Sequence, residues 1–211
     1  MTKLGEYFAV HWMDYIIMIL RHLEVSALSV VFAMIIAIPL GIFSTRCSML
    51  EKLSVRFWGM LRIIPSIAIL IVCIPIIGTG IVPAVVALTL LAIPPILINT
   101  TQAFKQLPEH IIEAAVGMGM DHRELFFKIK VPLAFPIVFT GVRTAIVEVI
   151  ASATLAAYIG AGGLGEIILT GLGLMRNDLL WIGGVTVAVL SLGTGYLLSL
   201  IHKNVTKYQR A

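Results

Sequence analysis

The chain has 211 residues, of which 59% are hydrophobic and 12% charged, and its mean hydropathy is +1.04. A soluble domain carries about 25% charged residues, so this composition excludes an ordinary water-exposed fold. The formal net charge is +4, but no Lys/Arg run with interleaved aromatic residues occurs. The charge therefore favours basic loops at an anionic membrane surface and argues against nucleic acid as a partner.

Apolar segments long enough to cross a bilayer recur along the chain. A spanning helix needs about 20 mostly apolar residues. An earlier segment, Met13–Leu20, is apolar but short, and charged residues flank it, so it predicts an interfacial or leading helix. The five predicted spans are Val25–Phe43, Phe57–Ile77, Pro83–Thr101, Phe135–Ile159 and Trp181–His202.

Basic residues predict the orientation of these spans. The loops after the first and third spans, together with the C-terminal tail, hold most of the Lys and Arg residues, and positive loops stay in the cytoplasm. The N-terminus is therefore expected outside and the C-terminus inside. We expect an extracytoplasmic or interfacial segment 1–24, a transmembrane domain 25–202 with a cytoplasmic loop 102–134, and a cytoplasmic tail 203–211.

Small and ionisable residues stand out inside the spans. Ala33, Ala37 and Gly41 form a stripe along which another helix can approach closely. Arg62 and Arg143 lie near enough to the expected inner interface to extend their charged ends towards it. Glu148 lies deeper, and either lines a transport route or pairs with another helix. Cys47 and Cys73 have no metal-ligand spacing.

The cytoplasmic loop between the third and fourth spans predicts two short helices. Pro108 suits the start of the first helix, and Gly117 and Gly119 end it. Asp121 can cap the second helix, with Glu124 as the reciprocal half of a capping box. Pro132 is expected to end that second helix and lead into the fourth span.

The length of this loop needs a reason, because joining two helices takes only a few residues. Small residues gather at one corner of its first helix, beside apolar Ile111, Ile112 and Met118. Apolar anchors at helical spacing are how a helix docks into a groove of another protein. The alternative from the residues alone is an amphipathic hairpin lying on the bilayer.

The same loop resembles a motif of importer-type ABC permeases. That family shows Glu-Ala-Ala, three residues, Gly, nine residues, Ile, one residue and Leu-Pro. Here Val131 replaces the usual leucine, which is a conservative change. The matching residues are Glu113, Ala114, Ala115, Gly119, Ile129 and Pro132.

The resemblance implies a five-span, all-α transmembrane bundle of the type I, methionine-importer-like permease class. Its loop would carry a coupling helix that sits in a cleft of a separate ATPase subunit, and ATP and Mg would be bound by that subunit. Glu113, Ala114, Ala115, Gly117 and Gly119, with Ile129 and Pro132, would belong to this coupling region. A second permease subunit, identical or paralogous, and an extracytoplasmic binding protein supplied as a separate chain would complete the transporter.

Other segments resemble one subfamily, the permeases for glycine betaine, carnitine, choline and proline betaine. The resemblance implies import of quaternary-ammonium osmoprotectants across the bacterial plasma membrane. Related permeases for methionine, phosphonate and taurine share the glycine-rich element and are the alternative. The segments are Ala153–Gly165, Ile77–Leu88 and Pro94–Thr100.

Segment 160–165 is also a literal G-x-G-x-x-G sequence. A dinucleotide site would need a preceding strand in a βαβ unit, whereas this segment follows a membrane helix. It predicts a tight turn before an external helix, Leu164–Leu172. The candidate pathway or gate residues are Glu148, Tyr158, Gly160, Gly162 and Gly163.

Two further classes of function stay open from the residues. A passive channel would carry solute without any ATPase, and an intramembrane enzyme would need a nucleophile beside a base. Neither H-E-x-x-H nor G-x-S-x-G occurs, and no phosphate-binding G-x-x-x-x-G-K-[ST] is present. We therefore expect no catalytic residue, no metal and no cofactor on this chain.

Overall fold

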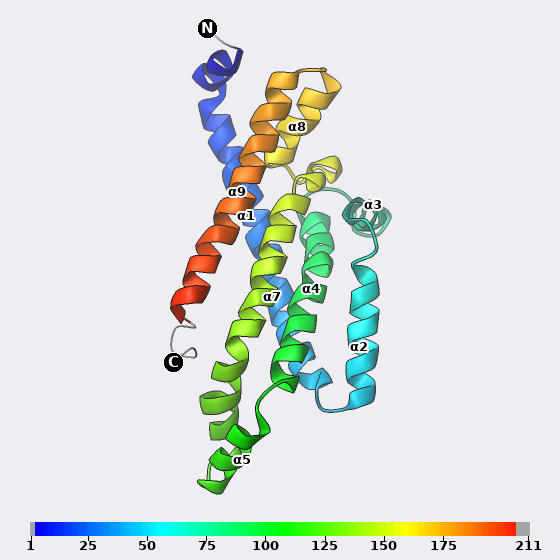
Figure 1. Cartoon of the computed structure of the whole chain (residues 1–211). Coiled ribbons are helices and arrows are strands. Elements are labelled where there is room, and N and C mark those ends of the chain that lie inside the picture. The colour runs from blue at the N-terminus through cyan, green and yellow to red at the C-terminus, as the bar shows by residue number, and fades with distance from the viewer. Residues whose placement is uncertain (1–2, 206–211) are drawn as a thin grey trace.

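The computed structural model describes residues 3–205 and, within them, the side chains of residues 8–204. This described part is helical without strands, as Figure 1 shows. In chain order its elements are α1 (Lys3–Ser44), α2 (Ser48–Leu61), α3 (Ser66–Ile77), α4 (Ile81–Lys105), α5 (Glu109–Gly117), α6 (His122–Glu124), η1 (Leu125–Lys130), α7 (Val131–Ser152), η2 (Leu155–Ile159), α8 (Leu164–Gly173) and α9 (Asn177–Val205).

Four long apolar helices of the described chain are each long enough to cross a membrane, and a bent pair passes the same test only when its two helices are taken together as one span. The long segments are Phe8–Ser44, Ile81–Lys105, His122–Ser152 and Asn177–Asn204. The expected all-α bundle is confirmed. The expected continuous second span is wrong, because α2 and α3 meet at 92°. Pro65 has extended backbone (φ −56°, ψ 134°) immediately before α3, and a proline disfavours helical backbone in the residue before it.

The first span is longer than the apolar count predicted. Segment Met13–Leu20 continues directly into the first span within α1, so it fits the predicted leading helix and not a separate interfacial helix. The helix departs from regular geometry at His11 (φ −112°, ψ 20°). Charged flanks made this segment look separate, although they do not interrupt backbone hydrogen bonding.

The fourth span differs from its expected bounds at both ends. Its α-helix ends at Ser152, and residues up to Ile159 form the 3₁₀ helix η2. Pro132 does not end the preceding helix, because α6, η1 and α7 run on from one to the next. η1 is a π-helical turn in which the Val131 N–H reaches back to the Phe126 carbonyl, so the chain enters α7 without a break.

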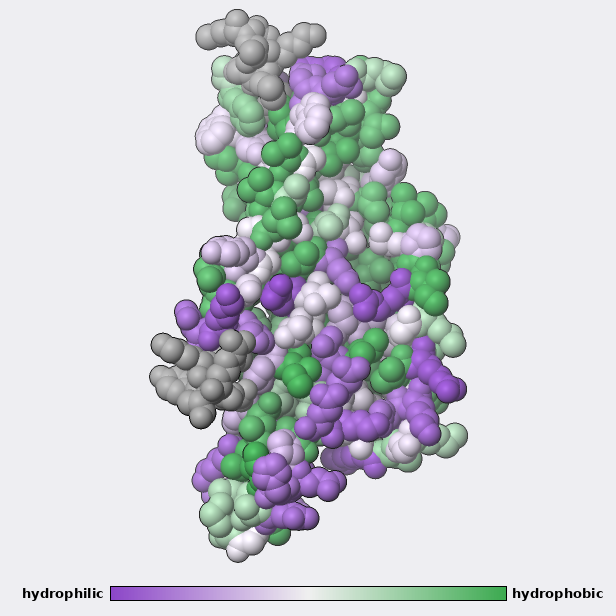
Figure 2. All heavy atoms as spheres, viewed as in Figure 1, coloured by the Kyte–Doolittle hydropathy of each residue, from purple (hydrophilic) through white to green (hydrophobic). Residues whose placement is uncertain are grey.

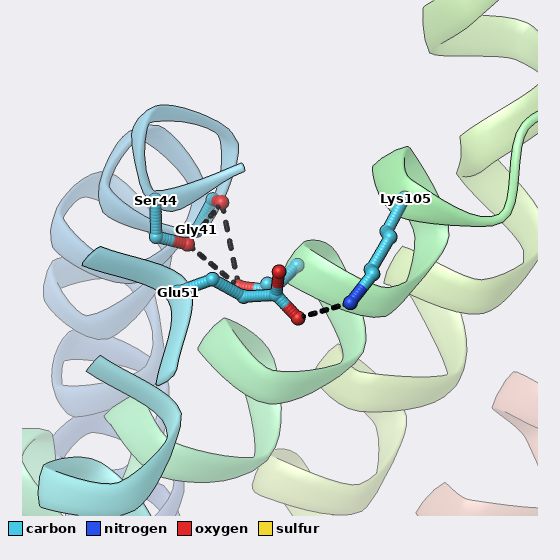
Figure 3. A network of polar contacts seen from close by, with 5 residues as sticks. Gly41, Ser44, Glu51 and Lys105 are labelled. Atoms are coloured by element: carbon cyan, nitrogen blue, oxygen red, sulfur yellow. Dashed lines mark hydrogen bonds and ion pairs between the residues drawn. The ribbon is translucent and has the colours of Figure 1, made fainter. Parts of the chain in front are cut away.

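The core lies between α1 and α4, which pack along the predicted stripe of small residues. Ala33 and Ala37 are fully buried, and a side chain at Gly41 would lie 2.8 Å from Thr100 Cβ. Ser44 Oγ donates to the Gly41 carbonyl at 2.7 Å and lies 3.0 Å from the Thr101 hydroxyl. Figure 3 shows this network beside a Glu51–Lys105 ion pair. The prediction of a close helix contact is confirmed.

The outer surface divides by polarity along the bundle. Figure 2 shows apolar side chains over much of the upper part of one face, whereas hydrophilic side chains gather in its lower half. Many large apolar side chains are exposed, including Ile76 (77%) and Leu192 (73%). Such exposure would be costly in water and is the expected surface towards lipid.

Candidate functional site

The loop between α4 and α7 projects beyond the bundle and presents apolar side chains. α5 lies at the bottom of Figure 1, past the end of α4. Val116 is 55% exposed and Met118 is 73% exposed, next to the exposed Glu113 and Ala114. These four residues are named the knob. Large apolar side chains on a short projecting helix are typical of a surface that another protein covers.

Stacked aromatic rings join the two ends of the loop that carries the knob. The rings of Phe104, at the end of α4, and Phe126, in η1, stack with centroids 5.9 Å apart. Leu125 and Ala115 are buried beneath them. Ala115, one of the residues predicted at the ATPase contact, therefore faces the inside of the loop. A movement of the knob is expected to carry α4 and η1 with it.

The turn after α5 depends on one glycine and one cap. Gly119 has φ +84°, a left-handed conformation that favours glycine, and space around it is open. Backbone strain, and not lack of space, is therefore the reason for glycine at this position. Asp121 accepts from the Glu124 N–H at 2.7 Å, as predicted. The second hydrogen bond of a capping box, from the Asp121 N–H to the Glu124 carboxylate, does not occur among the hydrogen bonds of the described residues. The Glu124 carboxylate instead accepts from Lys128.

The remaining coupling candidates do not lie on the knob. Ile129 is half-buried in η1, and Pro132 is exposed at the start of α7. Gly117 ends α5, is exposed, and has no neighbour within 4 Å of a built Cβ. The structure therefore groups Glu113 and Ala114 at one surface and places Ile129 and Pro132 in the segment that supports it.

An ion pair joins two of the charged residues inside the predicted spans. Arg62 Nη2 donates to Glu148 Oε1 at 2.8 Å. Arg62 lies at the bend between α2 and α3, and Glu148 lies one turn before the end of α7. Their side chains are 47% and 40% exposed. Arg62 therefore reaches a partner inside the protein rather than the inner interface, and Glu148 has the helix partner that was one of its two alternatives.

The exposed side of α7 carries hydroxyl groups below Glu148. Thr140 donates to the Pro136 carbonyl at 2.9 Å, and Thr144 donates to the Thr140 carbonyl at 3.0 Å. Each hydroxyl is thus satisfied by its own helix while keeping acceptor capacity outward. A row of Thr140, Thr144 and Glu148 is unsuited to lipid and favours a protein-covered or water-filled surface.

The glycine-rich segment lines a cavity at the end of the bundle opposite the knob. Gly160, Gly162 and Gly163 all have positive φ, between 78° and 82°. They line a cavity of about 590 Å³ together with Arg21 of α1 and Glu166 of α8. Tyr158 is 55% exposed but is not among the residues lining that cavity. The expected turn and the short helix after it are confirmed as η2, a glycine turn and α8 (Leu164–Gly173).

A buried histidine joins α1 to α7 beside this turn. The His22 Nε2–H donates to the Ile150 carbonyl of α7 at 2.9 Å, and the residue is 1% exposed. A side chain at Gly163 would come within 3.3 Å of the imidazole. The sequence analysis missed this role, because no spacing signal links His22 to a segment about 130 residues later.

Comparison with known proteins decides the family. Residues 29–207 match the family described as "Binding-protein-dependent transport system inner membrane component". The chain belongs to this family of inner membrane components. The glycine betaine/carnitine/choline transport system permease protein OpuCB of Bacillus subtilis (strain 168) is 38% identical to it over 186 residues, covering 88% of this chain and 86% of that protein.

Two more relatives define this inner membrane component further. The carnitine transport permease protein OpuCB of Listeria monocytogenes is 37% identical over 88% of this chain and 85% of that protein. Among solved structures, an inward-facing conformation of the MetNI methionine ABC transporter aligns with a TM-score of 0.77 and 22% identity. That alignment covers 98% of this chain and all of that one, and it shows the fold of type I importer permeases.

The inner membrane component has no recognisable cofactor constellation in residues 3–205. Among these residues no group of three His, Cys, Asp or Glu side chains could hold a metal ion. The G-x-G-x-x-G segment follows the 3₁₀ helix η2 rather than a strand. It therefore lacks the structural context of a dinucleotide site.

Proposed function

We propose that this inner membrane component is the permease subunit of an ATP-driven importer for quaternary-ammonium osmoprotectants such as glycine betaine, carnitine and choline. The relatives named for these solutes match most of the chain at 34–38% identity, which supports the substrate class. The single observation that carries the transport mechanism is the knob, which projects exposed Val116 and Met118 from the end of the bundle.

The knob is the proposed contact with a separate ATPase subunit that binds ATP and Mg. Glu113 and Ala114 would lie at that contact, and the stacked Phe104 and Phe126 would pass its movement to α4 and η1. Closure of the ATPase would then shift the bundle between two arrangements rather than deform it continuously. The chain itself would carry out no covalent chemistry.

The translocation route is proposed to lie on the face of α7 that bears Thr140, Thr144 and Glu148. A polar row of this kind needs a cover other than lipid. A second permease subunit, identical or paralogous, would supply it and leave a pathway between the two. An extracytoplasmic binding protein would deliver substrate near Gly160–Gly163. In this proposal the N-terminus lies outside and the C-terminus in the cytoplasm of a bacterial plasma membrane.

The test of coupling is a charge placed on the knob. Ala114→Glu is expected to abolish co-purification of the ATPase and osmoprotectant uptake, because a carboxylate would enter an apolar contact. Membrane insertion should be retained, since Ala114 is exposed. Gln106→Glu is the matched control, because Gln106 is exposed at the end of α4 but outside the knob.

Uptake by membrane vesicles separates the alternatives. Normal ATPase binding and uptake in Ala114→Glu would remove the knob from the mechanism. Uptake of choline without any ATPase subunit would identify a passive channel instead. If methionine, a phosphonate or taurine is taken up in place of quaternary ammonium compounds, the chain is still an importer subunit but the proposed substrate class is wrong.

A further inference from the structure

The Arg62–Glu148 ion pair is unusual in being both intramembrane and open. Both residues lie within helices or breaks that belong to candidate spans. An ion pair that only braces two helices is best buried between them, because burial shields it from competition by water and ions. Here close to half of each side chain remains exposed. The pair can therefore exchange partners without first unpacking the bundle.

The position of Arg62 adds a second feature. It is the first residue after α2, and the chain turns by 92° before α3 begins at Ser66. Broken helices in transporters place charged and backbone groups where small solutes bind. Glu148 comes from a different helix, α7, so the two charges can separate when α2 and α7 move relative to one another.

We propose that Arg62 and Glu148 form a transient subsite for zwitterionic substrates that carry one carboxylate and one quaternary ammonium group. The inference rests on the proposed osmoprotectant transport and narrows its substrate class. The substrate carboxylate replaces Glu148 on the Arg62 guanidinium, which can hold it with two parallel hydrogen bonds. The quaternary ammonium group, which has no donor, then faces Glu148 through charge alone.

Charge balance gives the subsite its selectivity. A zwitterion leaves both Arg62 and Glu148 with an opposite charge, so no unpaired charge is created in the membrane. A plain cation such as choline satisfies Glu148 but leaves Arg62 unpaired, which is costly in a low-dielectric site. Glycine betaine and carnitine are zwitterions of the required type, whereas choline lacks the carboxylate.

The experiment compares glycine betaine with choline in proteoliposomes holding the complete transporter. Arg62→Gln is expected to lower the maximal rate for glycine betaine at least about tenfold, the effect of losing one charge-assisted hydrogen bond. The choline rate should not fall, because that substrate makes no use of the guanidinium and the variant removes the charge that choline would leave unpaired. Glu148→Gln should lower both rates, because both substrates carry the ammonium group.

Matched variants separate binding from structure. Arg56→Gln removes an exposed arginine of the preceding helix α2 and should leave both rates near those of the unmodified chain. The doubly reversed Arg62→Glu, Glu148→Arg variant keeps an ion pair and should restore assembly and part of the glycine betaine rate. If a single variant fails to assemble, this double variant still tests the subsite.

Three outcomes would overturn the subsite. Equal losses for glycine betaine and choline in Arg62→Gln would assign the pair a bracing role. Unchanged rates in both single variants would place the pair off the route. An unmodified transporter that carries neither solute would overturn the proposed function itself, and the subsite with it.

Discussion

The Lys105 ammonium group donates to the Oε1 atom of Glu51 across 2.7 Å, so the last residue of α4 is tied to the first turn of α2 (Figure 3). Lys105 is 61% exposed and Glu51 is 20% exposed. The pair lies beside the buried contact of Ser44 with Thr101. It thus marks the corner where α1, α2 and α4 meet, immediately before the loop that carries the knob.

Glu51→Gln is expected to destabilise the chain by less than about 1 kcal/mol, because an exposed ion pair contributes little in high dielectric. The unfolding midpoint of the purified protein at low and high salt measures this. The small difference from the unmodified chain should fade at high salt. A loss of several kcal/mol that does not respond to salt would show a buried-pair role instead.

Gly165→Ala should destabilise the protein far more than Gly173→Ala, at the other end of the same helix α8. A Cβ at Gly165 would collide with the Thr154 carbonyl oxygen and lie 2.8 Å from Ala157 Cβ, and backbone cannot move aside cheaply. We expect destabilisation of about 1–3 kcal/mol or loss of folded protein. Gly173→Ala is the control, because nothing lies within 4 Å of its built Cβ. Thermal melting of both variants measures the difference, and equal melting temperatures would contradict the predicted collision.

Alanine should have opposite effects on stability at Gly117, which ends α5, and at Gly119 in the turn after it. Gly119→Ala places a Cβ on left-handed backbone at φ +84° and should cost about 1–2 kcal/mol. Gly117→Ala lies at the helical end of α5 in open space and should be neutral or stabilising by up to about 1 kcal/mol. Thermal melting together with ATPase co-purification measures both. A harmless Gly119→Ala would show that the turn adopts another conformation in the membrane.

Cys47 offers a native probe of orientation and pH. The backbone N–H groups of Met49 and Leu50 lower the pKa of its exposed thiol below the usual value. Since the thiolate is the reactive form, labelling by a charged maleimide should persist to lower pH than for a free cysteine. Inverted vesicles should label and intact cells should not.

The labelling result is checked by removing the thiol. Cys47→Ser should abolish labelling, because Cys73 is buried. Labelling of Cys47 in intact cells would invert the proposed topology and place the knob outside. If labelling instead follows the pH dependence of an ordinary thiol, the backbone N–H groups at the start of α2 do not lower the pKa of Cys47.

Apolar length predicted most of the bundle because lipid imposes it locally. The third and fifth spans, and the stripe of Ala33, Ala37 and Gly41, follow from composition and helical spacing alone. The break after Arg62 could not be predicted in the same way, because a hydropathy window measures length and not direction. Pro65 was the available signal, but prolines such as Pro94 and Pro95 lie inside the unbroken α4.

In the candidate site, too, local features could be predicted from the sequence and long-range contacts could not. Gly119 and Asp121 were predicted from local turn and cap chemistry, which depends on a few neighbouring residues. The pairing of Arg62 with Glu148 joins positions 86 residues apart, so no spacing rule could find it. Ala115 points inwards because of how α5 packs on η1, which the motif alone does not specify.

The length of α1 fixes where water begins on the outer side. The part of α1 after the irregular backbone at His11, from Trp12 to Ser44, makes a rod of about 50 Å, well over the roughly 30 Å thickness of a bilayer's hydrocarbon core. Arg21 stands about 35 Å along that rod from Ser44, already at the far headgroups. In the proposed orientation, the cavity walled by Arg21, Gly162 and Glu166 would open to the external medium, where dissolved ions could screen its charges before any solute passes inward.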